Sequence, residues 1–206
     1  EVTLKSDGAA IEKIDQGKLS DPQFLSFYND NLSGLDKNGL FTINIKDSTV
    51  LSGLISAADL ASIADLKSYL GNIYFLSPQN GGIIKSFVLE GGEYSKPARW
   101  LKEDRDLSKA TSFAVDGSIY VLDTTGRIIK FEAGKVVEFS VSGFDEVLSS
   151  ASVIYTDSQS TLIYILDPKS LKIISLSKDG VYQGRYTLEG IGLSEKSVFT
   201  VDEGAK

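Results

Sequence analysis

Short apolar runs separated by turn residues are the dominant pattern of this sequence, and they are most regular between residues 112 and 141. The runs Ser112–Val115, Ile119–Leu122, Arg127–Phe131 and Lys135–Val141 are separated by Asp-Gly, by an Asp-Thr-Thr-Gly turn and by Ala-Gly. Asp-Gly between β-rich runs favours a hairpin, because glycine adopts a positive φ without steric cost. The segment therefore predicts a four-stranded antiparallel meander.

The meander recurs along the chain, and a leucine followed by serine or alanine marks each unit. These markers recur at intervals of roughly 41 to 47 residues, and they are Leu19-Ser20, Leu60-Ala61, Leu107-Ser108, Leu148-Ser149 and Leu193-Ser194. A repeat of this length with four strands per unit is typical of β-propeller blades. We therefore predict an all-β fold, a five-bladed β-propeller of four-stranded antiparallel blades that forms a single domain over residues 1–206. The predicted blades are 24–54, 66–101, 111–141, 152–188 and a composite of 196–206 with 1–15.

The fifth blade is predicted to be closed by the two ends of the chain together. Ser197–Val201 matches the first strand of a blade, whereas Val2–Ser6 and Ala9–Ile14 match the third and fourth strands. Sharing a blade in this way would close the propeller and hide its sheet edges. The second strand has no counterpart in the sequence, so we expect either that it follows Lys206 in the natural chain or that this blade has three strands.

Two further local features bear on the prediction. In the connection 52–65, Leu60 and Ile63 fall at helical spacing, which predicts a turn or two of helix. Pro97 lies in the predicted fourth strand of the second unit, 94–101, and proline is tolerated mainly in edge strands. The fourth strand of a blade is its outer edge, so the proline agrees with the prediction.

Composition narrows the function classes. The 206 residues carry 28 acidic and 21 basic side chains, a net charge of −7, so we expect no binding to the phosphates of nucleic acid. Cysteine and histidine do not occur, which removes thiolate nucleophiles, the commonest general base and the usual catalytic triads. No apolar run is long enough to span a bilayer. The chain starts at Glu1 and contains no methionine, so we expect an excised domain with any signal or membrane anchor outside it.

The most regular segment, residues 112–141, resembles a known repeat. GSIYVLD at 117–123, followed by Arg127-Ile128, is similar to the NHL-type propeller repeat, as is LIYILD at 162–167 and, more weakly, NIYFL at 72–76. The first blade departs from it, with Gly34 in place of Val121. This resemblance implies a recognition platform for proteins, RNA or small molecules, and in a minority of cases an enzyme. The chain is also similar to propeller domains that a membrane helix joins to phosphatase-like domains in bacteria, which implies an extracytoplasmic domain of a membrane-tethered protein.

Acidic residues give two alternative metal-binding hypotheses, both weaker than a structural interpretation. Asp36, Asp123 and Asp167 each end a second strand, and such residues either bind cations as a ring or cap the following turn. Capping, or pairing with the basic residue that opens the next strand (Arg127, Lys172), is favoured. The Asn/Asp-rich turn that starts at Asn29 fails the calcium-loop pattern, because its twelfth position is a leucine.

A glycosidase-like site needs two or three carboxylates on the innermost strands. Asp65 is the only acid near the predicted starts of these strands, and one carboxylate does not make an acid–base pair. We therefore predict no catalytic residues, no metal site and no cofactor.

The stretch 96–105 is the most distinctive in composition, because it combines the only tryptophan with a cluster of basic residues in an acidic chain. It lies on the longest connection between blades. Tryptophan and arginine are enriched at binding hot spots, and loops over a rigid scaffold often carry function. We predict ligand or partner binding by Arg99, Trp100, Lys102 and Arg105. The alternative is that Trp100 packs between blades and 102–105 form a solvated loop.

The favoured function is a non-enzymatic recognition or sensor module that binds a protein or a small ligand on the face carrying the connections. One alternative is a lyase or hydrolase that depends on a divalent cation held by acidic residues. Another is a structural or oligomerisation module. We expect the domain itself to be monomeric, and any contact with a membrane to run through a segment outside this chain.

Overall fold

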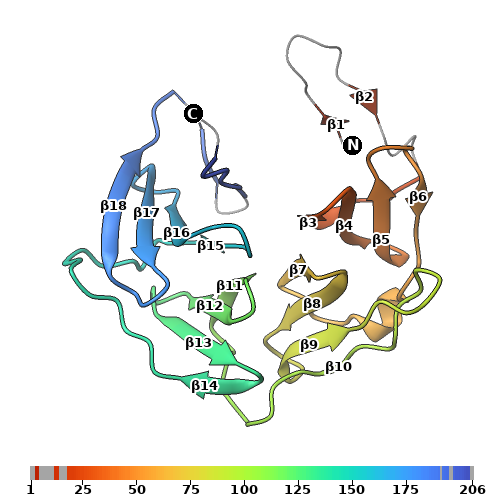
Figure 1. Cartoon of the computed structure of the whole chain (residues 1–206), viewed down its shortest axis with the longest axis horizontal. Helices are drawn as coiled ribbons and strands as arrows, with labels where there is room; N and C mark the ends of the chain where they lie inside the picture. Colours follow the sequence, from red (N-terminus) through yellow and green to blue (C-terminus); the bar gives the residue numbers. More distant parts are fainter. Residues whose placement is uncertain (1–2, 5–11, 14–17, 191, 195–196, 205–206) are drawn as a thin grey trace. The chain divides into compact units, whose positions relative to one another are not determined.

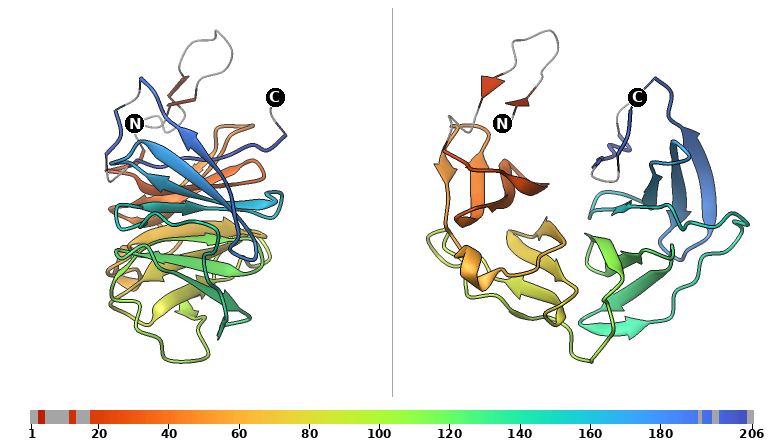
Figure 2. Two further views of the ribbon diagram at one scale, coloured as in Figure 1. Left: turned by 90° about the vertical axis from the view of Figure 1, so that its left-hand side faces the viewer. Right: turned by 180° about the vertical axis from the view of Figure 1, so that it is seen from behind.

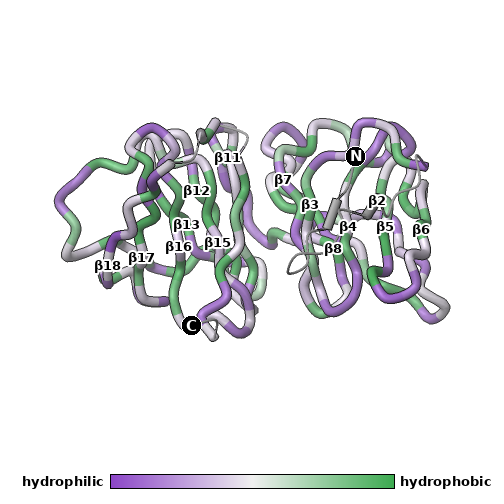
Figure 3. Tube along the Cα trace, turned by 90° about the horizontal axis from the view of Figure 1, so that it is seen from above, coloured by the Kyte–Doolittle hydropathy of each residue, from purple (hydrophilic) through white to green (hydrophobic). Residues whose placement is uncertain are grey.

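The computed structural model describes residues 3–4, 12–13, 18–190, 192–194 and 197–204. The chain divides into two compact units, Glu1–Arg99 and Trp100–Lys206, and each is described by itself. Apolar residues follow the strands, and the connecting turns are mainly hydrophilic (Figure 3). No helix in the described part of the chain is long and apolar enough to cross a membrane.

The first unit contains two antiparallel four-stranded sheets in which consecutive strands pair (Figure 1). The first sheet is β3 (Gln23–Tyr28), β4 (Asn31–Asp36), β5 (Gly39–Asn44) and β6 (Val50–Leu51), and the second is β7 (Asp65–Tyr69), β8 (Asn72–Ser77), β9 (Gly82–Ser86) and β10 (Ala98–Arg99). A separate pair joins β1 (Thr3–Leu4) to β2 (Glu12–Lys13). The predicted helix of the connection is a single 3₁₀ turn, η1 (Ala57–Asp59), which the Ser56 side chain caps by accepting from the Ala58 N–H.

The second unit repeats this arrangement. The third sheet of the chain lies in this unit and consists of β11 (Ala110–Val115), β12 (Ile119–Asp123), β13 (Ile128–Glu132) and β14 (Lys135–Val137). The fourth sheet consists of β15 (Val153–Tyr155), β16 (Leu162–Asp167), β17 (Lys172–Ser177) and β18 (Tyr182–Thr187). The four sheets correspond to the predicted blades 24–54, 66–101, 111–141 and 152–188. Their fourth strands are shorter than predicted: β10 covers only part of 94–101, and β14 only part of 135–141.

Neighbouring sheets within a unit pack face to face, with the first strands side by side (Figure 2). In the first unit, Leu40 of one sheet and Leu66 and Phe75 of the next belong to one buried cluster. In the second unit, Tyr120 and Ile165 belong to the corresponding cluster. The first strands are also joined by a serine hydroxyl that accepts from the next strand, Ser26 Oγ from Ser68 N at 2.8 Å and Ser112 Oγ from Ile154 N at 3.4 Å.

The prediction of five blades is wrong, because the described residues form four four-stranded sheets. Ser197–Val201, predicted as the first strand of the composite blade, is not a strand. Of the predicted N-terminal strands, only the short pair β1 and β2 lies within the described residues, and the rest of 1–15 lies outside them. The apolar spacing of 197–201 imitates a strand, but a strand also requires hydrogen bonds to a neighbour. The organisation as a single domain stays a prediction.

Candidate binding surface

A buried aspartate ends the second strand in three of the four blades. Asp36, Asp123 and Asp167 have exposed fractions of 9%, 3% and 6%. Each carboxylate accepts hydrogen bonds of 2.9–3.2 Å from backbone N–H groups of the turn that follows it. The predicted turn-capping role is confirmed. These carboxylates therefore stabilise the turns that follow them.

The predicted pairing with the next basic residue holds for Asp123 but not for Asp167. Arg127 Nε lies 3.1 Å from Asp123 Oδ2, whereas Lys172 Nζ lies 3.1 Å from Glu146 Oε2. The partner of Asp167 Oδ2 is the Ser150 hydroxyl, at 2.7 Å, in the connection that precedes the blade. The aspartate thus ties this connection to the turn between the second and third strands.

The hydrogen bonds at Asp123 stabilise its ionised form. Burial alone would raise the pKa of this carboxyl, but hydrogen bonds from the Thr125 side chain and backbone and from Arg127 together outweigh it, so the pKa is lowered. Thr125 donates from both its N–H and its hydroxyl to Oδ1, at 2.9 and 2.5 Å. Arg127 adds its N–H to the same oxygen at 3.1 Å. The conformation of the turn and the ionised form of Asp123 therefore stabilise each other.

The predicted binding residues fall on both sides of the boundary between the two units. Arg99 is exposed in β10 and ends the first unit, and Trp100, Lys102 and Arg105 open the second. Trp100 is half-buried, whereas Lys102 and Arg105 are exposed. The structure therefore places three of the four residues on the connection that leads into β11, and the grouping of all four in one site stays a prediction.

The connection surface, defined as residues 100–109, is fixed near both ends. Leu101 and Leu107 are buried, with exposed fractions of 5% and 4%, and the Lys102 N–H donates to the Gly134 carbonyl at 2.9 Å. At the other end, Thr124 N donates to the Lys109 carbonyl at 3.0 Å. The residues between Leu101 and Leu107 are exposed. A charged loop is thus held over a rigid sheet.

A small pocket lies where the connection surface meets the third sheet. It has a volume of about 30 Å³, and its lining includes Asp106, Leu107, Val121, Asp123 and Arg127. A cavity of this size holds a water molecule or two, whereas small-molecule sites enclose several hundred Å³. The connection surface is therefore suited to contact with a macromolecular surface rather than to enclosure of a substrate.

Asp106 at the rim of this pocket is stabilised as a carboxylate. The Ser108 side chain, followed by its backbone N–H at 2.9 Å, lowers the pKa of Asp106, and the charges of Lys109 and Arg127 act in the same direction. The rim thus carries charges of both signs. Sequence reasoning singled out the neighbouring Arg105 but gave no role to Asp106, because the approach of Arg127 depends on the fold.

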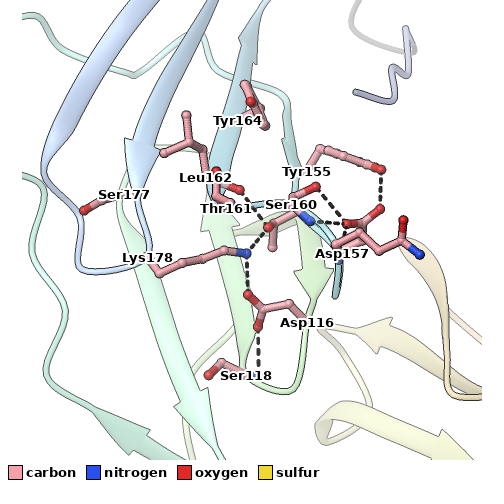
Figure 4. A network of polar contacts seen from close by, with 12 residues as sticks. Asp116, Ser118, Tyr155, Asp157, Ser160, Thr161, Leu162, Tyr164, Ser177 and Lys178 are labelled. Atoms are coloured by element: carbon pink, nitrogen blue, oxygen red, sulfur yellow. Dashed lines mark hydrogen bonds and ion pairs between the residues drawn. The ribbon is translucent and has the colours of Figure 1, made fainter. Parts of the chain in front are cut away.

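A second polar network lies at the opposite ends of these strands, on the hairpins of the second unit (Figure 4). Lys178, between β17 and β18, lies 2.5 Å from Asp116 of the β11–β12 hairpin and also donates to Thr156. Asp157 accepts from Tyr155 and from Ser160, each at 2.8 Å. No sequence motif indicated this network, since it joins hairpins from two blades.

The other candidate acids also have structural partners. Asp65 is buried, and its Oδ1 lies 2.7 Å from Lys67 Nζ and accepts from the Leu66 N–H at 2.8 Å. Asn29 occupies the tight turn between β3 and β4 with a φ of 51°, as a hairpin requires. In the described part of the chain, no group of three acidic side chains is placed to hold a metal ion.

Comparison with known proteins shows the fold. No protein-family model and no curated protein matches the chain. Solved structures that it resembles include a protein of unknown function from Bacteroides thetaiotaomicron (TM-score 0.57, 11% identity, 80% of this chain and 43% of that one). A nidogen/laminin complex has a TM-score of 0.58 and 11% identity, over 87% of this chain and 68% of that one. A streptogramin B lyase has a TM-score of 0.53 and 16% identity, over 83% of this chain and 56% of that one.

The structural neighbours are β-propeller proteins, so the chain has an all-β propeller fold. They include enzymes as well as binding proteins, and the chain spans about half the length of two of the three named here. At these identities the likeness concerns the fold alone. The resemblance to the NHL repeat and to phosphatase-linked propellers stays a prediction.

Proposed function

We propose that this chain is a non-enzymatic recognition module that binds a protein partner through the connection surface. The observation that carries the proposal is the contrast between its buried ends and its exposed middle. Leu101 and Leu107 hold the loop on the sheet, and Lys102 and Arg105 extend into solvent beside the half-buried Trp100. Because the loop is pre-organised, binding would cost little additional ordering.

The same geometry favours a protein over a small molecule. The adjoining pocket of about 30 Å³ is too small to enclose a ligand, so affinity would come from side chains on an open surface. Arginine and tryptophan are the residue types that dominate such surfaces. The rim carboxylate of Asp106 next to Arg105 and Lys109 suits a partner with charges of both signs.

The cation-dependent enzyme has less support. The aspartates that would have supplied ligands, Asp36, Asp123 and Asp167, accept hydrogen bonds from their own turns instead. The lyase among the structural neighbours shares the fold at 16% identity, which carries no information about a site. Thermal unfolding with Ca²⁺, Mg²⁺ or Mn²⁺ separates the two functions, since a metal bound to the folded state raises the apparent melting temperature.

The test is affinity capture followed by binding with the purified partner. Trp100→Ala and Arg105→Glu should each weaken binding at least tenfold, and Lys102→Glu should lower the association rate. Lys169→Glu, at an exposed site in the turn between β16 and β17, is the matched control and should bind like the wild type. Unchanged affinity in the Trp100 and Arg105 variants would refute the assignment of the binding site. Arg99→Glu, tested separately, shows whether the end of the first unit contributes.

A further inference from the structure

The segment 197–204 lies against the fourth blade without forming a strand. Its exposure alternates, with Ser197, Phe199 and Val201 half-buried and Val198 and Thr200 exposed. The Phe199 ring lies 5.8 Å from the ring of Tyr155, whose hydroxyl donates to Asp157 and lies 3.4 Å from the Val201 carbonyl oxygen. Residues 197–201 are thus bound through alternate side chains, as in an extended peptide, and Glu203 follows in a turn.

The strongest contact in this arrangement is made by one carboxylate. Glu203 accepts from the Thr161 N–H at 2.8 and 3.0 Å, from the Thr161 hydroxyl at 2.7 Å and from the Leu162 N–H at 3.1 Å. The Tyr164 hydroxyl adds a fourth donor at 3.0 Å. Two successive N–H groups and two hydroxyls that point at one anion form a carboxylate-binding site.

The β15–β16 hairpin differs in this respect from the β11–β12 hairpin in the same unit. In the β11–β12 hairpin, the Ser118 N–H donates to Asp116 of its own turn at 3.0 Å, and Asp116 also pairs with Lys178. In the β15–β16 hairpin, Asp157 likewise accepts from the Gln159 and Ser160 N–H groups of its own turn, at 2.9 and 2.7 Å. The next two N–H groups, those of Thr161 and Leu162, donate instead to a carboxylate 41 to 42 residues away. The carboxylate site is therefore not a general feature of the repeat.

We propose that the surface of Tyr155, Thr161, Leu162 and Tyr164 is a binding site for an extended acidic peptide of a partner protein. The recognised pattern is an aromatic residue followed four residues later by a glutamate, as Phe199 and Glu203 present it. The segment 197–204 occupies the site as an internal competitor. The site lies at the opposite end of the strands from the connection surface, and it does not depend on the function proposed there.

The internal competitor is exchangeable because no ladder of strand hydrogen bonds holds it. The described residues 197–204 form no strand, and their contacts with the fourth blade include the Phe199–Tyr155 ring contact and the Glu203 carboxylate. A short tether gives a bound segment an effective concentration in the millimolar range, so a free peptide at micromolar concentration competes poorly. Weakening the Glu203 contact in cis should therefore uncover the site.

The experiment uses the full chain and a fluorescent peptide with the sequence of residues 197–204, SVFTVDEG. Fluorescence polarisation is measured with the wild type, with Glu203→Gln and with Glu189→Gln, a matched control at another exposed glutamate. We expect Glu203→Gln to bind the peptide at least tenfold more tightly than the wild type or Glu189→Gln does. The peptide SVFTVDQG should bind Glu203→Gln at least tenfold more weakly than SVFTVDEG.

The location of binding is tested by amide chemical shifts. Titration of the Glu203→Gln variant with SVFTVDEG should move the Thr161 and Leu162 amide signals, and adding Thr161→Ala should lower the affinity severalfold. Absence of binding in a Glu203→Gln variant that circular dichroism shows to be folded would overturn the proposal, and so would equal binding of the two peptides. Concentration-dependent dimerisation of the wild type that excess peptide reverses would show a second copy as the occupant, which also overturns it.

Discussion

Replacing Asp123 by alanine tests the idea that one buried carboxylate holds the turn that follows it. The substitution removes the acceptor for the backbone N–H groups of Thr125 and Arg127, at 2.9 and 3.1 Å, and also for the Thr125 hydroxyl and Arg127 Nε. The two side chains are exposed and can bond to water instead, so the backbone bonds are the ones counted. Hydrogen bonds to a charged group contribute about 1.5–3 kcal/mol each. Because Thr125 and Arg127 are exposed, water can partly replace the lost acceptor, and the lower end applies. Two such bonds predict a loss of about 3 kcal/mol in the free energy of unfolding.

The assay is urea unfolding followed by the fluorescence of Trp100, which belongs to the same unit. With a slope of about 2 kcal/mol per molar, the loss corresponds to a shift of about 1.5 M in the midpoint. Asp123→Asn keeps an acceptor oxygen and should lose about half as much. Asp145→Ala, at an exposed acid in the next connection, is the control and should stay within about 0.5 kcal/mol of the wild type. Similar losses for Asp123→Ala and Asp145→Ala would refute the reasoning.

Three further predictions concern pH, backbone conformation and the carboxylate site. Folding lowers the pKa of Asp123, so its contribution to stability is present above the unfolded pKa of about 3.9 and is lost as the pH falls through the folded pKa. Between pH 5 and 2, the urea midpoint of Asp123→Asn should therefore vary less than that of the wild type. Gly180→Ala should lower the free energy of unfolding by more than about 2 kcal/mol, at least about twice the loss for Gly91→Ala. Both glycines have a positive φ, but of the two only Gly180 would place an added Cβ against a backbone oxygen, at 2.3 Å. Burial, followed by the Glu203 hydrogen bond, raises the pKa of Tyr164 to about 12, so Glu203→Gln should lower the midpoint of its ultraviolet phenolate titration; an unchanged midpoint would contradict the contact.

Local signals predicted the blades well because their determinants are close in sequence. Asp116-Gly117 specifies a hairpin and Asp123 caps the turn that follows it, so each feature is fixed within a few residues. The fourth strands were overestimated. The β10 strand covers only Ala98–Arg99, immediately after Pro97. An outer strand buries little apolar surface, so a sequence with weak alternation does not form a long strand there.

The features that sequence could not predict depend on distant partners. The segment 197–201 has the alternation of a strand, but no second strand in the described residues pairs with it, and the prediction of a fifth blade failed there. The carboxylate site needs Thr161 and Glu203 to meet, which no spacing rule indicates. The connection surface was indicated by composition alone, and the structure added its buried ends at Leu101 and Leu107.

The way in which the connections are fastened has a consequence for protein engineering. Near the fourth blade, Ser150 bonds to Asp167, and before the third blade Lys109 accepts from Thr124, so the fixed points are the residues directly ahead of the inner strand. The stretches before these anchors carry exposed residues. Foreign peptide loops grafted between Leu101 and Leu107 should therefore be displayed at little cost to folding, and the scaffold could serve as a host for selected binding loops.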